Sequence, residues 1–506
     1  MEQVKQIQGA LISVYHKEGL DEIARHLMDL GIKIYSTGGT ARYLQDLGAE
    51  VHLVEDLTGY PSILGGRVKT LHPKVHGGIL ARQSQQEDID TLHQYEIPII
   101  DLVIVDLYPF EETVASGADE ARIIEKIDIG GIALIRGAAK NFQDVVCIPS
   151  KAYYQDLVNI LDEQKGQTSL EDRKRLAGAA FGVSSHYDTH IHAFFAPEST
   201  ALKLSMPEGK VLRYGENPHQ KGTYYGDLEG EFIQLNGKPL SYNNLVDIDG
   251  ALQLVDEFTE PFFAIIKHTN PCGCATGSDL KEAWHRALEG DPISAFGGVL
   301  ACNGTIDGSL AKEINKLFFE VLVAEDFTEE AITVLQEKKK RIVLKRNTPK
   351  TVRKILKSAV GGYLVQDKDN VKITQDNLTV KTSRQPTETE IQDIIFGDTV
   401  GKHLKSNAIA IVKNGQLIGS GIGQTSRIDA LKQAIQKAEA RSFDLTGAVL
   451  ASDAFFPFSD SVEMAHQKGI EVVVEPGGSV RDEDSINFCE SHGMCLIFTG
   501  IRHFKH

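Results

Sequence analysis

The sequence predicts an α/β protein in which short buried strands alternate with helices along most of its 506 residues. Two observations lead to this fold class. In the first two hundred residues, each apolar run of strand length is followed by apolar residues at helical spacing, the pattern of βαβ units with a parallel sheet. In the remainder, two short segments each recur after nearly the same number of residues, which indicates an internal duplication.

The composition is that of a globular enzyme and excludes several other classes. A formal net charge of -17 argues against a general nucleic-acid binder and against an anionic membrane surface. Six cysteines are too few for a disulfide framework, and no apolar run is long enough to span a bilayer. The segment 1–6 lacks the basic and apolar regions of a signal peptide. We therefore expect a cytoplasmic protein that binds neither nucleic acid nor membrane.

The first βαβ unit contains a glycine-rich hinge. Buried strands over 10–14 and 32–35 flank a helix over 19–27, and the second strand runs into Ser36-Thr37-Gly38-Gly39-Thr40 before a helix over 41–47. Glycines let the backbone approach a ligand, hydroxyls add donors, and the free amides of a helix start favour phosphate. The motif predicts either a phosphate site or an ordinary turn.

A cationic segment over 65–78 follows, with Arg67, Lys69, His72 and Lys74 between pairs of glycines. This composition makes a poor helix and a poor strand, so we expect an ordered loop. Loops that concentrate cations in an acidic protein are more often ligand contacts than solvated faces.

Two further polar segments are expected at the same sheet edge. A buried strand over 99–105 ends at Asp106-Leu107-Tyr108-Pro109-Phe110, and Ile127-Asp128-Ile129-Gly130-Gly131 precedes an apolar segment that ends at Lys140-Asn141. A helix over 170–195 then closes the unit. We expect one domain over 1–196, a linker over 197–206 and a second domain over 207–506, divided into subdomains near 207–375 and 376–506.

A buried strand over 262–266 in the second domain ends in Lys267 and His268. Its five apolar residues are too few for a helix and lie between Pro261 and Pro271, which indicates a strand buried on both faces. A cation and an imidazole at a strand end are candidates for chemistry, because open α/β sheets bind ligands there. The alternative is a surface lysine and histidine without a role.

The duplication is visible in two pairs of segments. Residues 264–268 resemble residues 410–414 at an offset of 146, and residues 297–303 resemble residues 447–453 at an offset of 150. Two similarly folded subdomains are therefore expected, and only the first keeps the Lys-His pair.

His268, Cys272 and Cys274 suggest a zinc site of the deaminase type, which we do not expect to form. The residue two positions beyond His268 is Asn270, so the acid/base carboxylate of such enzymes is missing. Cysteines separated by one residue also fit one tetrahedral zinc poorly. We predict no metal.

Together with Leu212-Arg213-Tyr214-Gly215-Glu216-Asn217-Pro218-His219-Gln220 and Asp453-Ala454-Phe455-Phe456-Pro457-Phe458, these motifs resemble the bifunctional AICAR transformylase/IMP cyclohydrolase family of purine biosynthesis. The resemblance covers nearly the whole chain in the same order. It implies a methylglyoxal-synthase-like (Rossmann-like, parallel-sheet) cyclohydrolase domain and a transformylase made of two tandem cytidine-deaminase-like subdomains. It also implies a homodimer that shares its transformylase sites, with 10-formyltetrahydrofolate as co-substrate and no tightly bound cofactor.

Matched position by position, the resemblance implies which residues of the cyclohydrolase act. Lys69, Tyr108, Asp128 and Lys140 would lie nearest the reacting groups, with Lys140 as the proton carrier. Both reacting groups belong to one substrate molecule, so the domain must mainly fold the substrate and move protons. The nucleotide would be held by Lys17, Ser36, Thr37, Gly38, Gly39, Thr40, Arg67, Val68 and Thr70.

For the transformylase, the resemblance implies that His268 accepts a proton from the 5-amino group of AICAR as this amine attacks the formyl carbon. Lys267 would stabilise the oxyanion or help to protonate the departing folate nitrogen. The implied substrate-binding positions are Arg213, Tyr214, Gly237, Phe296, Gly297, Glu320, Asn407, Arg427, Phe455, Asp460, Ser479, Val480 and Arg502.

Four residues at three places depart from the family pattern. Tyr15-His16-Lys17 stands where Ser-Asp-Lys is common, Asp106 stands where Asn is usual, and Glu320 stands where Asp is frequent. We expect the charge of Asp106 to weaken the binding of a phosphate-bearing ligand or to shift its pH dependence. Two other classes stay open: a zinc-dependent hydrolase and a catalytically idle nucleotide-binding protein.

Overall fold

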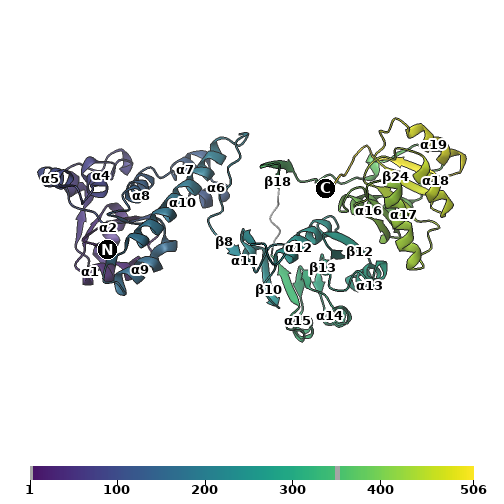
Figure 1. Ribbon diagram of the computed structural model, residues 1–506, viewed down its shortest axis with the longest axis horizontal. Coiled ribbons are helices and arrows are strands. Elements are labelled where there is room, and N and C mark those ends of the chain that lie inside the picture. The colour runs from purple at the N-terminus through teal and green to yellow at the C-terminus, as the bar shows by residue number, and fades with distance from the viewer. Residues whose placement is uncertain (1–3, 348–353) are drawn as a thin grey trace. The chain divides into compact units, whose positions relative to one another are not determined.

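The computed structural model describes residues 4–347 and 354–506, and the chain divides into two compact units, Met1–Glu208 and Gly209–His506 (Figure 1). The segment expected as a linker, 197–206, belongs to the first unit. No helix among the described residues is long and apolar enough to cross a membrane.

The first unit is built on a five-stranded sheet in the order β4-β3-β2-β5-β6, and all of its strand pairs are parallel. The predicted parallel sheet is therefore confirmed. Its strands are β2 (Gly9–Val14), β3 (Lys33–Ser36), β4 (Val51–Leu53), β5 (Leu102–Asp106) and β6 (Val146–Ile148). A two-stranded ribbon of β1 (Lys5–Gln6) and β7 (Gln167–Thr168) lies beside it.

Helices cover both faces of this sheet, because successive side chains of a strand point to opposite faces. Ala10, Ile12 and Val14 of β2 pack with α1 (Leu20–Asp29) and α9 (Tyr154–Asp162). Leu11 packs on the other face, with α4 (Pro73–Leu80), α8 (Gly130–Lys140) and α10 (Leu170–Phe195). The other helices are α2 (Gly38–Asp46), α3 (Val54–Thr58), α5 (Gln86–Gln94), α6 (Phe110–Ala115), α7 (Glu120–Ile124) and the 3-10 turns η1 (Leu64–Gly66) and η2 (Lys151–Tyr153).

The predicted loop over 65–78 is wrong in its second half, which forms α4. Pro73 occupies the first helical position, where its missing N–H costs nothing, and the His72 ring accepts a hydrogen bond from the Lys74 amide at 3.2 Å. Gly78 packs so closely that a Cβ there would lie 2.4 Å from the Pro98 carbonyl oxygen. The glycine therefore serves helix packing and does not mark a loop.

The second unit contains a twelve-stranded sheet in which two five-stranded halves meet at β12 and β22. The first half has the order β17-β15-β13-β11-β12, and the second has β25-β24-β23-β21-β22. The strands are β11 (Phe262–Lys267), β12 (Asn270–Thr276), β13 (Val299–Cys302), β15 (Val321–Ala324), β17 (Ile342–Arg346), β21 (Ile409–Lys413), β22 (Gln416–Gly421), β23 (Val449–Ser452), β24 (Val472–Glu475) and β25 (Cys495–Phe498), with β10 (Phe232–Asn236) and β20 (Thr379–Val380) at the edges.

The structure confirms the duplication in detail. Ile266 pairs with Val299 in the first half, and Val412 pairs with Val449 in the second, as the offsets of 146 and 150 require. Both hairpins shift register at the same place, between Ile265 and Ile266 and between Ile411 and Val412.

The helices repeat in the same order in both halves. In the first half they are α12 (Tyr242–Val255), α13 (Leu280–Gly290), α14 (Gly308–Ile314) and α15 (Glu329–Gln336), and in the second α16 (Glu388–Lys402), α17 (Arg427–Ala440), α18 (Asp460–Gln467) and α19 (Asp482–Ser491). Smaller elements are α11 (Leu228–Glu231), η3 (Gln375–Asn377), the strand pairs β8 (Gly209–Val211) with β9 (Thr223–Tyr225) and β14 (Thr305–Ile306) with β16 (Asp326–Phe327), and the hairpin β18 (Lys354–Ala359) with β19 (Gly362–Asp367).

The strand that ends in Lys267 is buried as predicted, with residues 262–266 at 0% exposure. It runs antiparallel to both neighbours, β12 and β13. The rule that ligands bind where parallel strands end therefore does not by itself place a site here. Its carboxyl end is followed at once by a turn in which His268 and Thr269 have φ of 56° and 66°.

Candidate active sites

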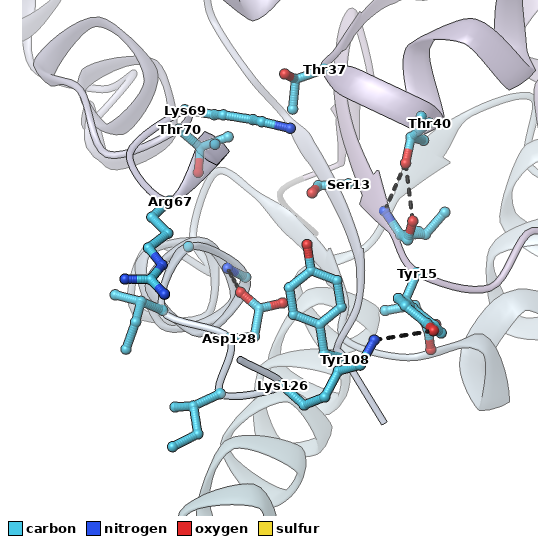
Figure 2. Close-up of a pocket in the computed structure, with 18 of the residues that line it drawn as sticks. Ser13, Tyr15, Thr37, Thr40, Arg67, Lys69, Thr70, Tyr108, Lys126 and Asp128 are labelled. Atoms are coloured by element: carbon cyan, nitrogen blue, oxygen red, sulfur yellow. Dashed lines mark hydrogen bonds between the residues drawn. The ribbon is translucent and has the colours of Figure 1, made fainter. Parts of the chain in front are cut away.

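A cavity of about 740 Å³ lies at the carboxyl edge of the first unit's sheet (Figure 2). Its walls come from the segments after β2, β3 and β5, from the turn before Thr70 and from the start of α8, as expected for an α/β sheet edge. The lining residues are Ser13, Val14, Tyr15, Lys17, Thr37, Gly39, Thr40, Gly65, Gly66, Arg67, Lys69, Thr70, Asp106, Tyr108 and residues 124–131.

Most residues predicted for the cyclohydrolase line this cavity, and four do not. Ser36 is buried beneath it, with Oγ donating to the Ile12 carbonyl at 2.8 Å. Gly38 and Val68 flank lining residues without lining the cavity themselves. Lys140 ends the helix that Gly130 begins, about 15 Å further along the helix axis. The structure therefore does not bring Lys140 to this cavity.

Lys17 is held at the cavity wall by backbone and hydroxyl oxygens. Its ammonium donates to the Val14 carbonyl and to Thr40 Oγ1, the latter at 3.1 Å. Burial lowers the pKa of Lys17, and the nearby carboxylates of Asp106 and Glu18 oppose this shift. The ammonium also donates to the Tyr15 carbonyl at 3.2 Å, so the side chain is a fixed cation that can act on a ligand through its charge.

Lys69 points across the cavity towards the glycine-rich turn at the start of α2 (Figure 2). A Cβ at Gly38 would lie 2.8 Å from Lys69 Nζ, and Gly38 has φ of 56°, so this position favours glycine on both counts. Among the described residues, the Lys69 ammonium forms no hydrogen bond or ion pair. Its charge is therefore available to an anionic or polarised ligand.

Asp128 and Tyr108 form the acid/base side of the cavity. The Asp128 carboxylate accepts the Gly131 amide at 2.6 Å, and its own amide donates to Tyr187 Oη at 2.9 Å. Burial raises the pKa of Asp128 against the opposing effect of the Gly131 amide, and Asp106 raises it further. Burial also raises the pKa of Tyr108, with smaller contributions from Asp128 and Tyr15. The raised pKa keeps the Tyr108 phenol protonated as a hydrogen-bond donor, and Asp128 is the candidate for taking up a proton.

Sequence reasoning did not single out Tyr15 and Lys126 as site residues. Lys126 Nζ lies 4.7 Å from the centre of the Tyr15 ring and 5.5 Å from that of Tyr108, and it donates to Tyr15 Oη at 3.3 Å. The two tyrosine rings meet edge to face at 5.4 Å. Tyr15 and Tyr108 therefore form an aromatic wall of the cavity, with the Lys126 ammonium beside both rings. In the sequence, only the closeness of Lys126 to Asp128 could have indicated that Lys126 belongs to the site.

In the second unit, Lys267 and His268 are placed by the turn that follows β11. Lys267 Nζ donates to the Phe296 carbonyl at 2.7 Å and lies beside Gly297, which has φ of 70°. The turn is fixed by Asp247, whose carboxylate accepts the Thr269 amide at 2.7 Å. The His268 side chain is exposed. The pair is thus held by backbone geometry with the imidazole facing solvent.

Other predicted substrate residues gather near Lys267. Phe296 is 61% exposed and packs against Phe318, and the Glu320 amide donates to the Gly298 carbonyl at 3.0 Å. The Glu320 carboxylate pairs with Lys238 at 2.8 Å, beside Gly237 with φ of 103°.

Arg427 and Asn407 belong to a second group, in the second half of the duplication. The Arg427 guanidinium is buried and pairs with Asp453, Ser452 and Asn407. Its charge is therefore already balanced by the protein, so it is better suited to holding Asn407 than to binding an anion. Asn270, next to the His268 turn, accepts the Lys405 amide at 3.1 Å and so links the two groups.

The remaining predicted positions lie on the surface of the second unit. Arg213 and Arg502 stack over the rings of Tyr214 and Phe504 at 5.7 and 4.5 Å. Ser479 donates its amide to Asp482 at 2.9 Å. Phe455 and Val480 are exposed, and Asp460 begins α18.

The residues of the suspected zinc site do not fit a zinc ion. Burial raises the pKa of the Cys272 thiol to about 12 and also raises that of Cys274, which is fully buried. Cys272 instead donates to the Ile265 carbonyl at 3.4 Å. Cys274 packs in one core cluster of the sheet and Cys272 against another, and these residues are not among the groups of the described chain whose ligand atoms could hold one metal ion.

Fold and site define an α/β enzyme with a cavity lined by lysine and arginine side chains at a parallel sheet and, in its second unit, a duplicated mixed sheet. Comparison with known families agrees: residues 138–437 match the family described as AICARFT/IMPCHase bienzyme, and residues 19–133 match the MGS-like domain. The chain belongs to the AICARFT/IMPCHase bienzyme family. The predicted bifunctional enzyme, with AICAR transformylase and IMP cyclohydrolase activities, is confirmed.

Full-length relatives support this assignment. The chain is 55% identical to a bifunctional purine biosynthesis protein PurH of Bacteroides thetaiotaomicron over 100% of both chains. It is 47% identical to the PurH of Aquifex aeolicus, over 98% of this chain and 100% of the relative. The PurH of Acetivibrio thermocellus is 44% identical, over 99% and 100%.

Proposed function

We propose that the cavity of the first unit carries out the cyclohydrolase step and that the Lys267-His268 turn carries out the formyl transfer. The observation that carries the first assignment is the placement of Lys17 and Lys69 opposite Asp128 and Tyr108 around one cavity. Two cations at one cavity suit a phosphorylated substrate, and a buried carboxyl beside a phenol suits proton transfer.

In the cyclohydrolase step, the carboxamide nitrogen of formyl-AICAR attacks the formyl carbon of the same molecule. A C–N bond forms, the carboxamide nitrogen and the formamide nitrogen each give up one proton, and the bond from the formyl carbon to its oxygen breaks as that oxygen leaves as water. Lys69 stabilises the negative charge that develops on this oxygen, and Asp128 and Tyr108 move the protons. Lys140 has no part in this proposal, because the structure places it at the far end of α8.

In the transfer step, the 5-amino group of AICAR attacks the formyl carbon of 10-formyltetrahydrofolate. This amine is conjugated to its ring and is a weak nucleophile, so His268 removes its proton during the attack. Lys267, held beside Gly297, stabilises the oxyanion; the bond from the formyl carbon to the folate nitrogen then breaks, and the proton taken by His268 passes to that nitrogen as tetrahydrofolate leaves. The exposed Phe296 and the surface positions Arg213, Phe455 and Arg502 supply contacts for the two substrates.

The test is a His268→Ala variant assayed in both steps. We expect formyl transfer to fall at least about 100-fold while cyclisation of supplied formyl-AICAR stays unchanged. His285→Ala, on the exposed side of α13, is the matched control and should affect neither step. Loss of both activities in His268→Ala would contradict two separate sites.

We further propose a homodimer, which the β18–β19 hairpin supports. Its large apolar side chains are exposed, including Leu356, Val360, Tyr363 and Leu364, and a two-stranded ribbon of this kind is marginal in water alone. A Leu356→Lys/Leu364→Lys variant should shift the protein from dimer to monomer in light scattering. A dimer that survives this change would remove the hairpin from the interface. Location in the cytoplasm and the absence of a tightly bound cofactor remain predictions.

A further inference from the structure

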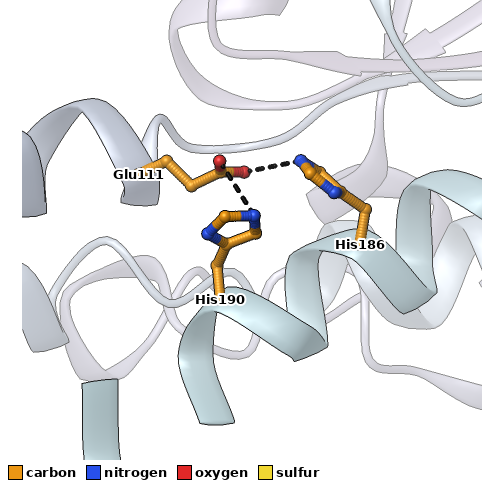
Figure 3. Close-up of side chains that lie close together, drawn as sticks. All are labelled: Glu111, His186 and His190. Atoms are coloured by element: carbon orange, nitrogen blue, oxygen red, sulfur yellow. Dashed lines mark ion pairs between the residues drawn. The ribbon is translucent and has the colours of Figure 1, made fainter. Parts of the chain in front are cut away.

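Glu111, His186 and His190 form a cluster outside the cavity and outside the Lys267-His268 turn (Figure 3). One oxygen of the Glu111 carboxylate lies 3.0 Å from His186 Nε2, and the other lies 3.2 Å from His190 Nε2. The three ligand atoms all lie within 4.8 Å of one another. We propose that this cluster binds one Zn²⁺ ion and that the ion clamps α6 to α10.

The ligand set suits zinc. Two imidazoles and one carboxylate, with water as the fourth ligand, are a common tetrahedral arrangement for this ion. Zinc bonds of about 2.0 to 2.2 Å place neighbouring ligand atoms about 3.4 Å apart. The Glu-His separations need to widen only slightly to reach that spacing. The side chains are 41%, 23% and 39% exposed for Glu111, His186 and His190, so an ion and its water can enter from solvent.

The two helices hold the ligands in place before any metal binds. His186 and His190 are four residues apart on α10, so they share one face of a long helix. The centres of their rings lie 4.5 Å apart. The buried Phe110, next to Glu111, packs edge to face against Tyr187 and Phe194 of α10. The positions of Glu111 and the two histidines are therefore set by a small aromatic core.

A second contact orients one of the imidazoles. His186 Nδ1 lies 2.9 Å from Ser205 Oγ, and this hydroxyl can accept the Nδ1 proton. The Nε2 lone pair then faces Glu111 and His190, which is the usual tautomer of a histidine that binds a metal. When no metal is bound, each Nε2 atom must carry a proton to form a hydrogen bond with the Glu111 carboxylate.

A zinc ion between α6 and α10 would affect the cavity through the segments that carry Tyr108 and Asp128. Tyr108 lies two residues before the start of α6. The Tyr187 hydroxyl of α10 donates to the Lys126 carbonyl at 2.6 Å and accepts a hydrogen bond from the Asp128 backbone amide. Fixing α6 against α10 would therefore steady both the phenol and the loop that carries the carboxylate.

The test is titration of the metal-free full chain with Zn²⁺ in competition with a chromophoric chelator. We expect one tightly bound ion per chain in the wild type, binding at least about 100-fold weaker in His186→Ala and His190→Ala, and binding about 10-fold weaker in Ser205→Ala. His192→Ala, on the same helix but outside the cluster, should bind like the wild type. Circular dichroism checks that each variant is folded.

Two further readouts separate a built site from adventitious binding. Co²⁺ in the wild type should give the visible absorption of a four-coordinate site, and His190→Ala should abolish it. Zn²⁺ should raise the Tm of the wild type and leave that of His190→Ala unchanged. Equal binding by the wild type, His186→Ala and His190→Ala, or no stoichiometric binding by the wild type, would overturn the proposal.

Discussion

His16 Nδ1 lies 2.8 Å from the Asp106 carboxylate, and the His16 amide donates to the same oxygen at 3.0 Å. The structure joins these two residues beside the cavity, which Asp106 lines. The carboxylate that we expected to disturb a phosphate-bearing ligand is therefore in hydrogen-bonding contact with a neighbour. Asp106 is also one of the carboxylates that favour the charged form of Lys17.

The first prediction follows from this pair. His16→Ala should raise the KM for formyl-AICAR about 3- to 10-fold, because it leaves the Asp106 carboxylate with one donor fewer near an anionic substrate. The double variant His16→Ala/Asp106→Asn should return the KM to near the wild-type value. Steady-state cyclisation kinetics of the three proteins test this, and a double variant no better than His16→Ala would show that the lost donor to Asp106 is not the cause.

Lys69→Ala should stall the pathway at formyl-AICAR. Removing the free ammonium should lower kcat of cyclisation about 100- to 1,000-fold, because the oxyanion loses its main donor. The intermediate can be followed by chromatography of the reaction mixture. Lys74→Ala, in α4 and outside the cavity lining, is the matched control. Normal IMP output from Lys69→Ala would remove this lysine from the mechanism.

The rate of cyclisation should respond to pH through Asp128. Burial raises the pKa of this carboxyl above the usual value, so its basic form is lost at a higher pH than for an ordinary aspartate. When Asp128 acts as the base, kcat/KM should fall as the pH decreases through this raised pKa. Asp128→Asn should lower kcat about 100-fold and abolish that acid limb. An unchanged limb in the variant would assign it to another group.

Glu475 should make the wild-type protein less stable as the pH rises. The side chain is 1% exposed, one of its oxygens accepts the Phe456 amide, and burial raises its pKa to about 8. At a pH between about 4.3, the usual pKa of glutamate, and about 8, Glu475 holds a proton in the folded state that it has lost in the unfolded state. The free energy of unfolding therefore falls as the pH rises through this range.

Glu475→Gln removes this proton linkage. The variant should melt about 2 to 6 °C above the wild type at pH 8, a gain of about 1 to 2 kcal/mol, and close to it at pH 5. Thermal melts followed by circular dichroism at the two pH values test this. A difference in Tm that does not change with pH would show that the carboxyl group is ionised in the folded state.

Local patterns predicted much of the fold because they report burial. The helix over 170–195 was predicted with the bounds of α10, and the structure shows that Ser169 caps its start. The buried strand over 262–266 was also predicted correctly. Its direction was not accessible, because a continuous apolar run looks alike in parallel and antiparallel sheets.

Long-range packing explains what the sequence could not predict. Gly77 and Gly78 lower helix propensity, and only their contacts with residues 97–100 show why a helix forms there. The placement of Lys140 followed from family resemblance, and the length of α8 separates it from the cavity. Glu111 and His186 are 75 residues apart in sequence, so the spacing of the two histidines was the one visible sign of the cluster.

The junction between β12 and β22 also has a consequence for how the chain can be divided. Ala275 pairs with Gln416 there, and the Gln416 side chain donates from Nε2 to the Arg286 carbonyl at 2.8 Å. A fragment that stops near residue 375 would expose β12 as a bare edge, which invites pairing with other molecules and aggregation. The two repeats therefore form one continuous sheet, and we expect either repeat to aggregate when it is expressed alone.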